Sequence, residues 1–108
     1  MKTKTLIILI HLVIITQGNL FSQTWVKKQD FPDNIGRENA VSFNINGEFY
    51  TGTGYGTSFT RDFYKYNPVT NTWTNIPSVP SDSRTNAIGF SLNGKGYCGT
   101  GNLATQTP

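Results

Sequence analysis

The chain has 108 residues, a formal net charge of +3, one histidine and one cysteine. Its cations are scattered and form no basic stripe, so we expect no binding to nucleic acid. One cysteine excludes a disulfide framework within the chain. The composition is rich in aromatic residues, glycine, asparagine and threonine and poor in helix-forming residues, which favours β structure.

Residues 1–22 are predicted to be a secretory signal peptide. Two lysines near the start precede an apolar run, residues 6–15, that is too short for a membrane span. Cleavage after Gly18 or Ser22 would leave a nearly neutral chain of about 86 residues. An N-terminal membrane anchor is the alternative. We therefore expect a secreted, periplasmic or cell-surface protein with no membrane contact after cleavage.

The mature chain contains an internal repeat. Residues 37–54 and 84–101 align at an offset of 47, with 10 of 18 positions identical. A period of this length is typical of solenoids and propellers, in which each repeat needs neighbours to bury its apolar faces. The repeat therefore predicts an architecture, and it names no ligand.

A single outer strand is predicted ahead of the first repeat, at residues 24–29. Trp25 lies 48 residues before Trp73, a residue of the first repeat's predicted last strand. In a closed propeller such a strand completes the last blade.

Residues 37–76 are predicted to form one full blade of four antiparallel strands. Apolar and polar residues alternate on both sides of Asn46-Gly47, and this dipeptide favours a type I′ hairpin turn. A second turn is expected around Pro68. The four strands are expected at residues 41–45, 48–54, 62–66 and 72–76.

Residues 84–101 are predicted to form half of a second blade. Two strands, residues 88–92 and 95–101, flank Asn93-Gly94 as their counterparts flank the first turn.

These residues resemble a Kelch repeat of the galactose-oxidase-type β-propeller family. The resemblance implies an all-β fold: an incomplete Kelch-type propeller over residues 24–104, built from four-stranded antiparallel blades. Many Kelch repeats end the second strand in adjacent glycines, whereas both copies here end in Gly-Thr-Gly. The resemblance rests on Arg37, residues 50–54, residues 62–68, Thr72 and Trp73.

The residues that define the repeat are expected to be structural. Arg37 and Arg84 should pair with a carboxylate such as Asp62 or with backbone carbonyls, and ligand binding is the alternative role. Tyr66 and Trp73 should fill the wedge between adjacent blades. The complete set is Arg37, Gly47, Tyr50, Gly52, Gly54, Asp62, Tyr66, Trp73, Arg84, Gly94, Tyr97, Gly99 and Gly101.

No residue is assigned a catalytic, cofactor-binding or metal-binding role. His11, the single histidine, falls in the predicted signal peptide, so the mature chain lacks the usual ligands for zinc or copper and the base of a catalytic triad. The glycine-rich stretch 52–56 opens no helix and is not expected to bind phosphate. Cys98 is expected to be a half-buried sheet residue, with a reactive thiol as the alternative.

The favoured function is a non-catalytic module that binds a protein or a glycan through its loops, with no cofactor. Two alternatives remain open. The first is part of a Kelch-type sugar enzyme, such as a sialic-acid mutarotase or a copper sugar oxidase, whose catalytic residues lie on other blades. The second is a structural spacer in a larger surface protein. Because four blades of this period need roughly 190 residues, we expect the chain to be a fragment.

Overall fold

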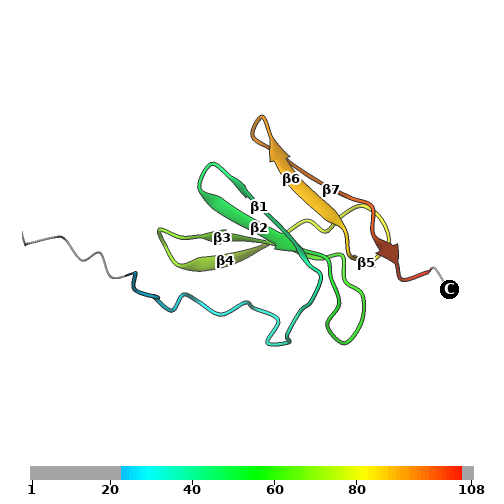
Figure 1. Ribbon diagram of the computed structural model, residues 1–108, viewed down its shortest axis with the longest axis horizontal. Helices are drawn as coiled ribbons and strands as arrows, with labels where there is room; N and C mark the ends of the chain where they lie inside the picture. The colour runs from blue at the N-terminus through cyan, green and yellow to red at the C-terminus, as the bar shows by residue number, and fades with distance from the viewer. Residues whose placement is uncertain (1–22, 106–108) are drawn as a thin grey trace, which may run out of the picture.

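The computed structural model describes residues 23–105 (Figure 1), and within that range every regular element is a β-strand. The all-β fold expected from the composition and the repeat is therefore confirmed. The predicted signal peptide, residues 1–22, lies outside the described residues. Over residues 23–105 there is no helix with the length and hydropathy of a membrane span.

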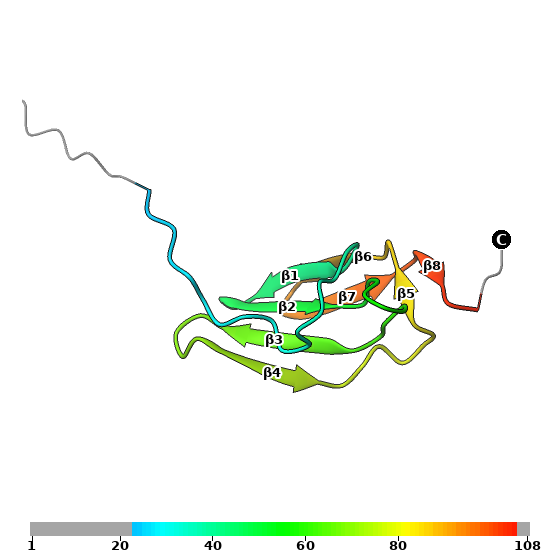
Figure 2. The ribbon, with the colours of Figure 1, turned by 90° about the horizontal axis from the view of Figure 1, so that it is seen from below.

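The first repeat forms one four-stranded antiparallel sheet with its strands in chain order. Each strand pairs with the next, as in a blade of a propeller (Figure 2). Aromatic and β-branched residues dominate these strands, which suits a pleated, half-buried surface. The strands are β1 (Val41–Ile45), β2 (Glu48–Gly52), β3 (Phe63–Asn67) and β4 (Thr72–Ile76).

The second repeat forms the hairpin of β6 (Ile88–Leu92) and β7 (Lys95–Gly99). Its turn has φ of +50° at Asn93 and +71° at Gly94, and the first hairpin has +51° at Asn46 and +85° at Gly47. Two successive positive φ angles define the type I′ turn that the Asn-Gly dipeptide predicts. The two copies therefore share backbone geometry as well as sequence.

The second strand of each repeat is two residues shorter than predicted. β2 ends at Gly52 and β7 ends at Gly99, because the next two residues turn into the left-handed region. Thr53 and Gly54 have φ of +56° and +96°, and their counterparts behave alike. Residues in this conformation leave the extended geometry that a ladder needs.

A short pair of strands, which the sequence did not predict, closes the base of the second hairpin. β5 (Arg84–Thr85) pairs with β8 (Asn102–Leu103). In the first repeat the equivalent pairing is a single β-bridge between Glu38 and Tyr55.

Residues 24–29, the predicted outer strand, pair with no strand among the described residues. The Trp25 side chain is fully exposed. A segment forms a β-strand only when it pairs with another strand. The predicted partners of residues 24–29 belong to a different blade. The end of the segment is nevertheless fixed, because Gln29 N donates to Asn71 Oδ1 at 2.9 Å and Trp73 Nε1 donates to Gln29 O at 3.1 Å.

The two repeats pack against each other, with β6 of the second repeat lying beside β1 of the first (Figure 1). We call the side of each sheet that carries Val41 and its counterpart Ile88 the front face, and the opposite side the back face. The back of the β6–β7 hairpin covers the front of the first blade, where Val41 is only 4% exposed. The front of β6–β7 is uncovered, and Ile88 is 63% exposed.

Candidate functional site

The strand directions place two kinds of connection at opposite ends of the blades (Figure 1). The tight hairpin turns lie at one end, which we call the turn face. The longer connections lie at the other end, the loop face, which consists of residues 31–40, 53–62 and 77–87. Because long loops carry binding sites more often than tight turns, the loop face is the candidate site.

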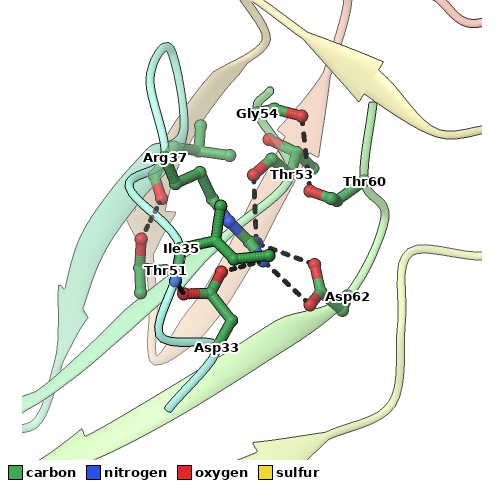
Figure 3. A network of polar contacts seen from close by, with 9 residues as sticks. Asp33, Ile35, Arg37, Thr51, Thr53, Gly54, Thr60 and Asp62 are labelled. Carbon is green, nitrogen blue, oxygen red and sulfur yellow. Dashed lines mark hydrogen bonds and ion pairs between the residues drawn. The ribbon is translucent and has the colours of Figure 1, made fainter. Parts of the chain in front are cut away.

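Arg37 is at the centre of the polar network on the loop face (Figure 3). Its Nη1 donates to Asp62 Oδ1 at 2.7 Å and to the carbonyl of Thr53 at 3.2 Å. Its Nη2 donates to Asp62 Oδ2 at 3.0 Å and to Asp33 Oδ2 at 2.7 Å. The bidentate bond to Asp62 uses the planar fork of the guanidinium. One side chain therefore connects the segment before β1, the end of β2 and the start of β3.

The network is shielded from solvent. The Arg37 side chain is 8% exposed, Asp33 is 18% exposed and Asp62 is 30% exposed. The Arg37 guanidinium also lies 5.1 Å from the centroid of the Phe31 ring, within the range of a cation–π contact. An arginine with this many partners is held in one conformation, and Arg37 therefore links the three segments that carry Asp33, Thr53 and Asp62.

The charges of the network shift both partners toward their ionised forms. Burial acts to raise the pKa of the Asp62 carboxyl, but the hydrogen bonds and charge of Arg37 outweigh burial and place this pKa below its usual value. Burial acts to lower the pKa of Arg37, and the two carboxylates outweigh it, so that pKa is raised. Both groups are therefore charged at neutral pH.

Arg84 repeats the position of Arg37 with different partners. Its Nη1 donates to the carbonyl of Thr100 at 2.8 Å, the counterpart of the Thr53 contact. Its Nη2 donates to Ser81 Oγ at 2.5 Å, where the first repeat has Asp33. Among the described residues, Arg84 has no carboxylate partner. Both arginines donate to a backbone carbonyl, as a structural residue would, and their structural role stays a prediction.

The long loop 53–62 is attached to the second repeat by backbone hydrogen bonds. Gly54 N donates to Arg84 O at 2.8 Å, and Arg84 N donates to Thr60 O at 3.0 Å. The Thr60 side chain also bonds to Gly54 O at 3.3 Å (Figure 3). The loop is therefore fixed on one side by Arg37 and on the other by the start of the second repeat.

Aromatic residues of this loop reach the surface of the loop face. Tyr55 is 40% exposed, and its ring meets the edge of Phe59 at a centroid distance of 5.7 Å. Tyr55 and Gly56 line a surface depression together with Gly36, Arg37 and Glu38. The depression combines an exposed aromatic ring, a carboxylate and accessible backbone on a fixed frame.

The other repeat-defining residues support the blades. The Tyr66 ring is buried and lies 4.9 Å from the Trp73 ring, while its hydroxyl bonds to Asn71 Oδ1 at 2.7 Å. Both rings lie on the back face, where Phe31 packs edge-on against Trp73. Tyr50 stacks on Phe43 on the front face, and Tyr97 stacks on Phe90 in the second hairpin.

The glycines among the repeat-defining residues either allow neighbouring atoms to approach the backbone closely or adopt the positive φ of a turn. A Cβ on Gly52 would lie within 2.5 Å of the Phe63 ring, and one on Gly101 would lie 2.4 Å from the carbonyl oxygen of Thr85. Gly54 is equally confined, 2.7 Å from the carbonyl of Glu38. Gly99 is the exception, because its φ is not positive and its Cβ would meet nothing within 4 Å.

Cys98 is half-buried at the back of the second hairpin. Burial raises the pKa of its thiol, and the charge of Arg84 opposes this only in part. A raised pKa means little thiolate at neutral pH, which is the opposite of an activated nucleophile. Within residues 23–105, moreover, no three histidine, cysteine or acidic side chains come together as a metal-binding group.

A hollow of about 460 Å³ lies between the front of the first blade and the β6–β7 hairpin. Its lining includes Phe63, Ile76 and Cys98. In the first blade β3 and β4 continue the sheet beyond β2, whereas among residues 23–105 no strand continues the β6–β7 sheet beyond β7. The hollow is therefore the space that two outer strands of a second blade would fill, and we do not treat it as a ligand site.

Sequence reasoning identified Arg37 and Asp62 but not the third member of the network. Asp33 precedes Arg37 by four residues, and this spacing of opposite charges was the available signal. Ser81 stands in the same place for Arg84, although one residue closer in sequence.

Comparison with known proteins agrees with this geometry. A family model described as the Kelch motif matches residues 45–80, and no curated protein matches the chain. Among solved structures, "Structure of YjhT", a Kelch-type β-propeller, is similar with a TM-score of 0.67 and 30% sequence identity. The alignment covers 82% of this chain but only 27% of that one. The internal repeat, the four-stranded blade, the family-model match and the similar solved structure show that this chain carries a Kelch motif and that its described residues form Kelch-type propeller blades.

Proposed function

We propose that the chain is part of a secreted, non-catalytic Kelch propeller that binds a protein partner at the loop face. Kelch repeats commonly mediate protein interactions. The observation that carries the proposal is the frame around Arg37, which holds loop 53–62 in one conformation before any partner arrives. A rigid loop loses little conformational entropy on binding, and this saving favours affinity.

Within that frame, Tyr55 is the residue best suited to contact a partner. Aromatic side chains with a polar end are enriched among the residues that dominate binding energies. Tyr55 is partly exposed and its ring is braced by Phe59, while Glu38 beside it offers a hydrogen-bond acceptor. This arrangement fits a partner that presents an apolar group and a donor.

The test compares a loop-face variant with a turn-face variant. Screening the chain against a library of secreted proteins and against a glycan array identifies the partner and distinguishes its two classes. We expect Tyr55→Ala to weaken binding by about tenfold or more, as for a dominant interface residue. Val69→Ala, a change at a 91% exposed position on the turn face, should leave binding unchanged.

The result would contradict the proposal if Val69→Ala reduced binding and Tyr55→Ala did not. Binding of glycans alone would move the function to carbohydrate recognition at the same face. Turnover of a sugar by the chain itself would instead favour the enzyme alternative. Thermal unfolding of both variants checks that neither change acts through the fold.

Secretion is a separate part of the proposal. It rests on the charge and hydropathy pattern of residues 1–22. N-terminal sequencing of the protein exported by its host should find Asn19 or Gln23 as the first residue. Recovery of the intact N-terminus in the membrane fraction would favour the anchor instead.

A further inference from the structure

The two Asn-Gly turns share their backbone geometry but differ in one hydrogen bond. In the first turn the backbone nitrogen of Gly47 donates to Asn44 Oδ1 at 3.1 Å. In the second repeat Ser91 stands in the place of Asn44, at the offset of 47. Within residues 23–105 no side chain accepts a hydrogen bond from the backbone nitrogen of Gly94. A side chain therefore holds this nitrogen in the first turn and not in the second.

The nitrogen matters because the side chain of an asparagine can react with the backbone nitrogen of the next residue, and asparagine is one of the thermolabile residues of proteins. The nitrogen gives up its proton and attacks the side-chain Cγ, a C–N bond forms, and the side-chain amide leaves as ammonia. The product is a cyclic succinimide. Water then opens this ring at either of its carbonyl carbons and leaves aspartate or isoaspartate. Water is the only co-reactant.

Both turns are open to this reaction. Glycine has no Cβ to crowd the attacking nitrogen or to restrict the backbone rotation that brings it to Cγ. A Cβ built on Gly47 or on Gly94 would meet nothing within 4 Å, and both Asn-Gly pairs are exposed. The tips of the two hairpins lie at the turn face (Figure 1), where they line one surface depression. Access to water therefore does not distinguish the two turns, whereas the hydrogen bond from Asn44 does.

We propose that Asn93 is a site of spontaneous deamidation and that Asn44 protects the equivalent Asn46. A nitrogen that donates a hydrogen bond has to break that bond before it loses its proton and attacks. The loss of one hydrogen bond of this kind corresponds to a factor of about two to ten in rate. Asn93 should therefore react first, although the two turns have the same dipeptide.

The reaction changes the tip of the β6–β7 hairpin. A negative carboxylate replaces a neutral amide at residue 93, and the isoaspartate product also places an extra methylene group in the backbone of the turn. Aspartate tolerates the left-handed φ of +50° found at Asn93, whereas isoaspartate lengthens the turn. The turn face lies at the opposite end of the blades from the loop face, so the modification is independent of a partner bound at the loop face.

The first experiment follows the full chain during incubation in a mildly alkaline buffer. Samples are digested with trypsin at mildly acidic pH, which places the two turns on separate peptides, residues 38–61 and 85–95. Mass spectrometry with electron-transfer fragmentation locates each converted residue and distinguishes isoaspartate from aspartate. We expect Asn93 to convert about two- to tenfold faster than Asn46.

Asn86 is an internal control on the same peptide as Asn93. Its φ is also left-handed, at +55°, but alanine follows it. The Cβ of Ala87 crowds the backbone nitrogen, so Asn86 should remain unconverted while Asn93 reacts.

Two reciprocal variants test the protecting bond. Asn44→Ser gives the first turn the residue of the second, and it should raise the rate at Asn46 to that at Asn93. Ser91→Asn gives the second turn the residue of the first, and it should lower the rate at Asn93 to that at Asn46. Both substituted positions are exposed, and circular dichroism checks that the sheets are retained.

The same measurement in concentrated urea separates the hydrogen bond from the local sequence. Unfolding removes the bond from Gly47 to Asn44, so the rates at Asn46 and Asn93 should become equal. A ratio in urea as large as that in the folded chain would overturn the proposal, because the local sequence would then set the rates. Conversion of Asn46 at least as fast as that of Asn93 in the folded chain would also overturn it, as would an Asn46 rate that Asn44→Ser leaves unchanged.

Discussion

Arg37 and Arg84, 47 residues apart, donate hydrogen bonds to equivalent carbonyl oxygens, at 3.2 Å to Thr53 and 2.8 Å to Thr100. Both acceptor residues have left-handed φ angles, +56° and +63°. The repeated unit is therefore larger than its strands. It also includes the threonine of positive φ that follows the second strand, whose carbonyl accepts a hydrogen bond from the arginine at the start of the repeat. The two arginines differ only in what else they bind, which allows the contribution of the carboxylates to be measured.

Replacing each arginine by alanine should have unequal effects on stability. Arg37→Ala should lower the free energy of unfolding by about 3 kcal/mol, because it leaves two shielded carboxylates without their cation. Arg84→Ala should cost about 1 kcal/mol, since it removes hydrogen bonds to two carbonyls and a hydroxyl. Urea unfolding followed by tryptophan fluorescence measures both losses. Equal losses would show that the carboxylates contribute nothing.

Acid should weaken the fold through Asp62. Its pKa in the folded chain lies below the 3.8 of an unperturbed aspartate, so the unfolded chain binds protons first as the pH falls. The stability that Asp62 contributes is complete above its unfolded pKa and is lost as the pH drops through the folded value. We expect the difference in urea midpoint between the natural chain and Asp62→Asn to be large at pH 6 and to shrink below about pH 4.

The control for this prediction is Asp30→Asn. Asp30 pairs with Lys27, and both side chains are more than 70% exposed. Exposed pairs contribute little to stability, so this variant should follow the natural chain at every pH. A difference between Asp62→Asn and the natural chain that stayed constant down to pH 2.5 would contradict the role given to Asp62.

The sequence was sufficient for the parts of the fold that depend on local pattern. Asn46-Gly47 and the alternation around it determine one hairpin, and the repeat transfers that hairpin to Asn93-Gly94. The strand ends were harder to place, because a threonine at positive φ runs against its propensity and only the packed turn shows it. The third member of the Arg37 network is an i,i+4 neighbour, Asp33, and its role depends on how the segment before β1 bends.

The contact between the blades should be sensitive to single methyl groups. Gly96→Ala should cost about 1–3 kcal/mol, because the added Cβ would overlap the Phe43 ring and force the two repeats apart. Gly89→Ala should cost a similar amount through Val41. The matched control is Gly99→Ala on the same hairpin, where the Cβ meets nothing within 4 Å. It should be neutral or stabilise by about 0.5 kcal/mol, because alanine restricts the unfolded chain.

Thermal and urea unfolding of the three glycine variants give the comparison. A loss at Gly99 as large as the loss at Gly96 would mean that alanine harms the hairpin itself, and that the distance between the blades is not set by these glycines.

Replacing the left-handed Thr100 by glycine should change stability in the opposite sense from the same replacement at an ordinary strand residue. Thr100 has φ of +63°, which strains a β-branched residue, and its position is exposed. Thr100→Gly should therefore stabilise by about 1 kcal/mol once the strain is released. Thr53→Gly releases the same strain but gives up a fully buried methyl group, so its net effect should be close to zero. Thr74→Gly, at an exposed position within β4, should destabilise by about 1 kcal/mol. Urea midpoints rank the three variants, and a Thr100→Gly chain less stable than the natural one would mean that this threonine is not strained.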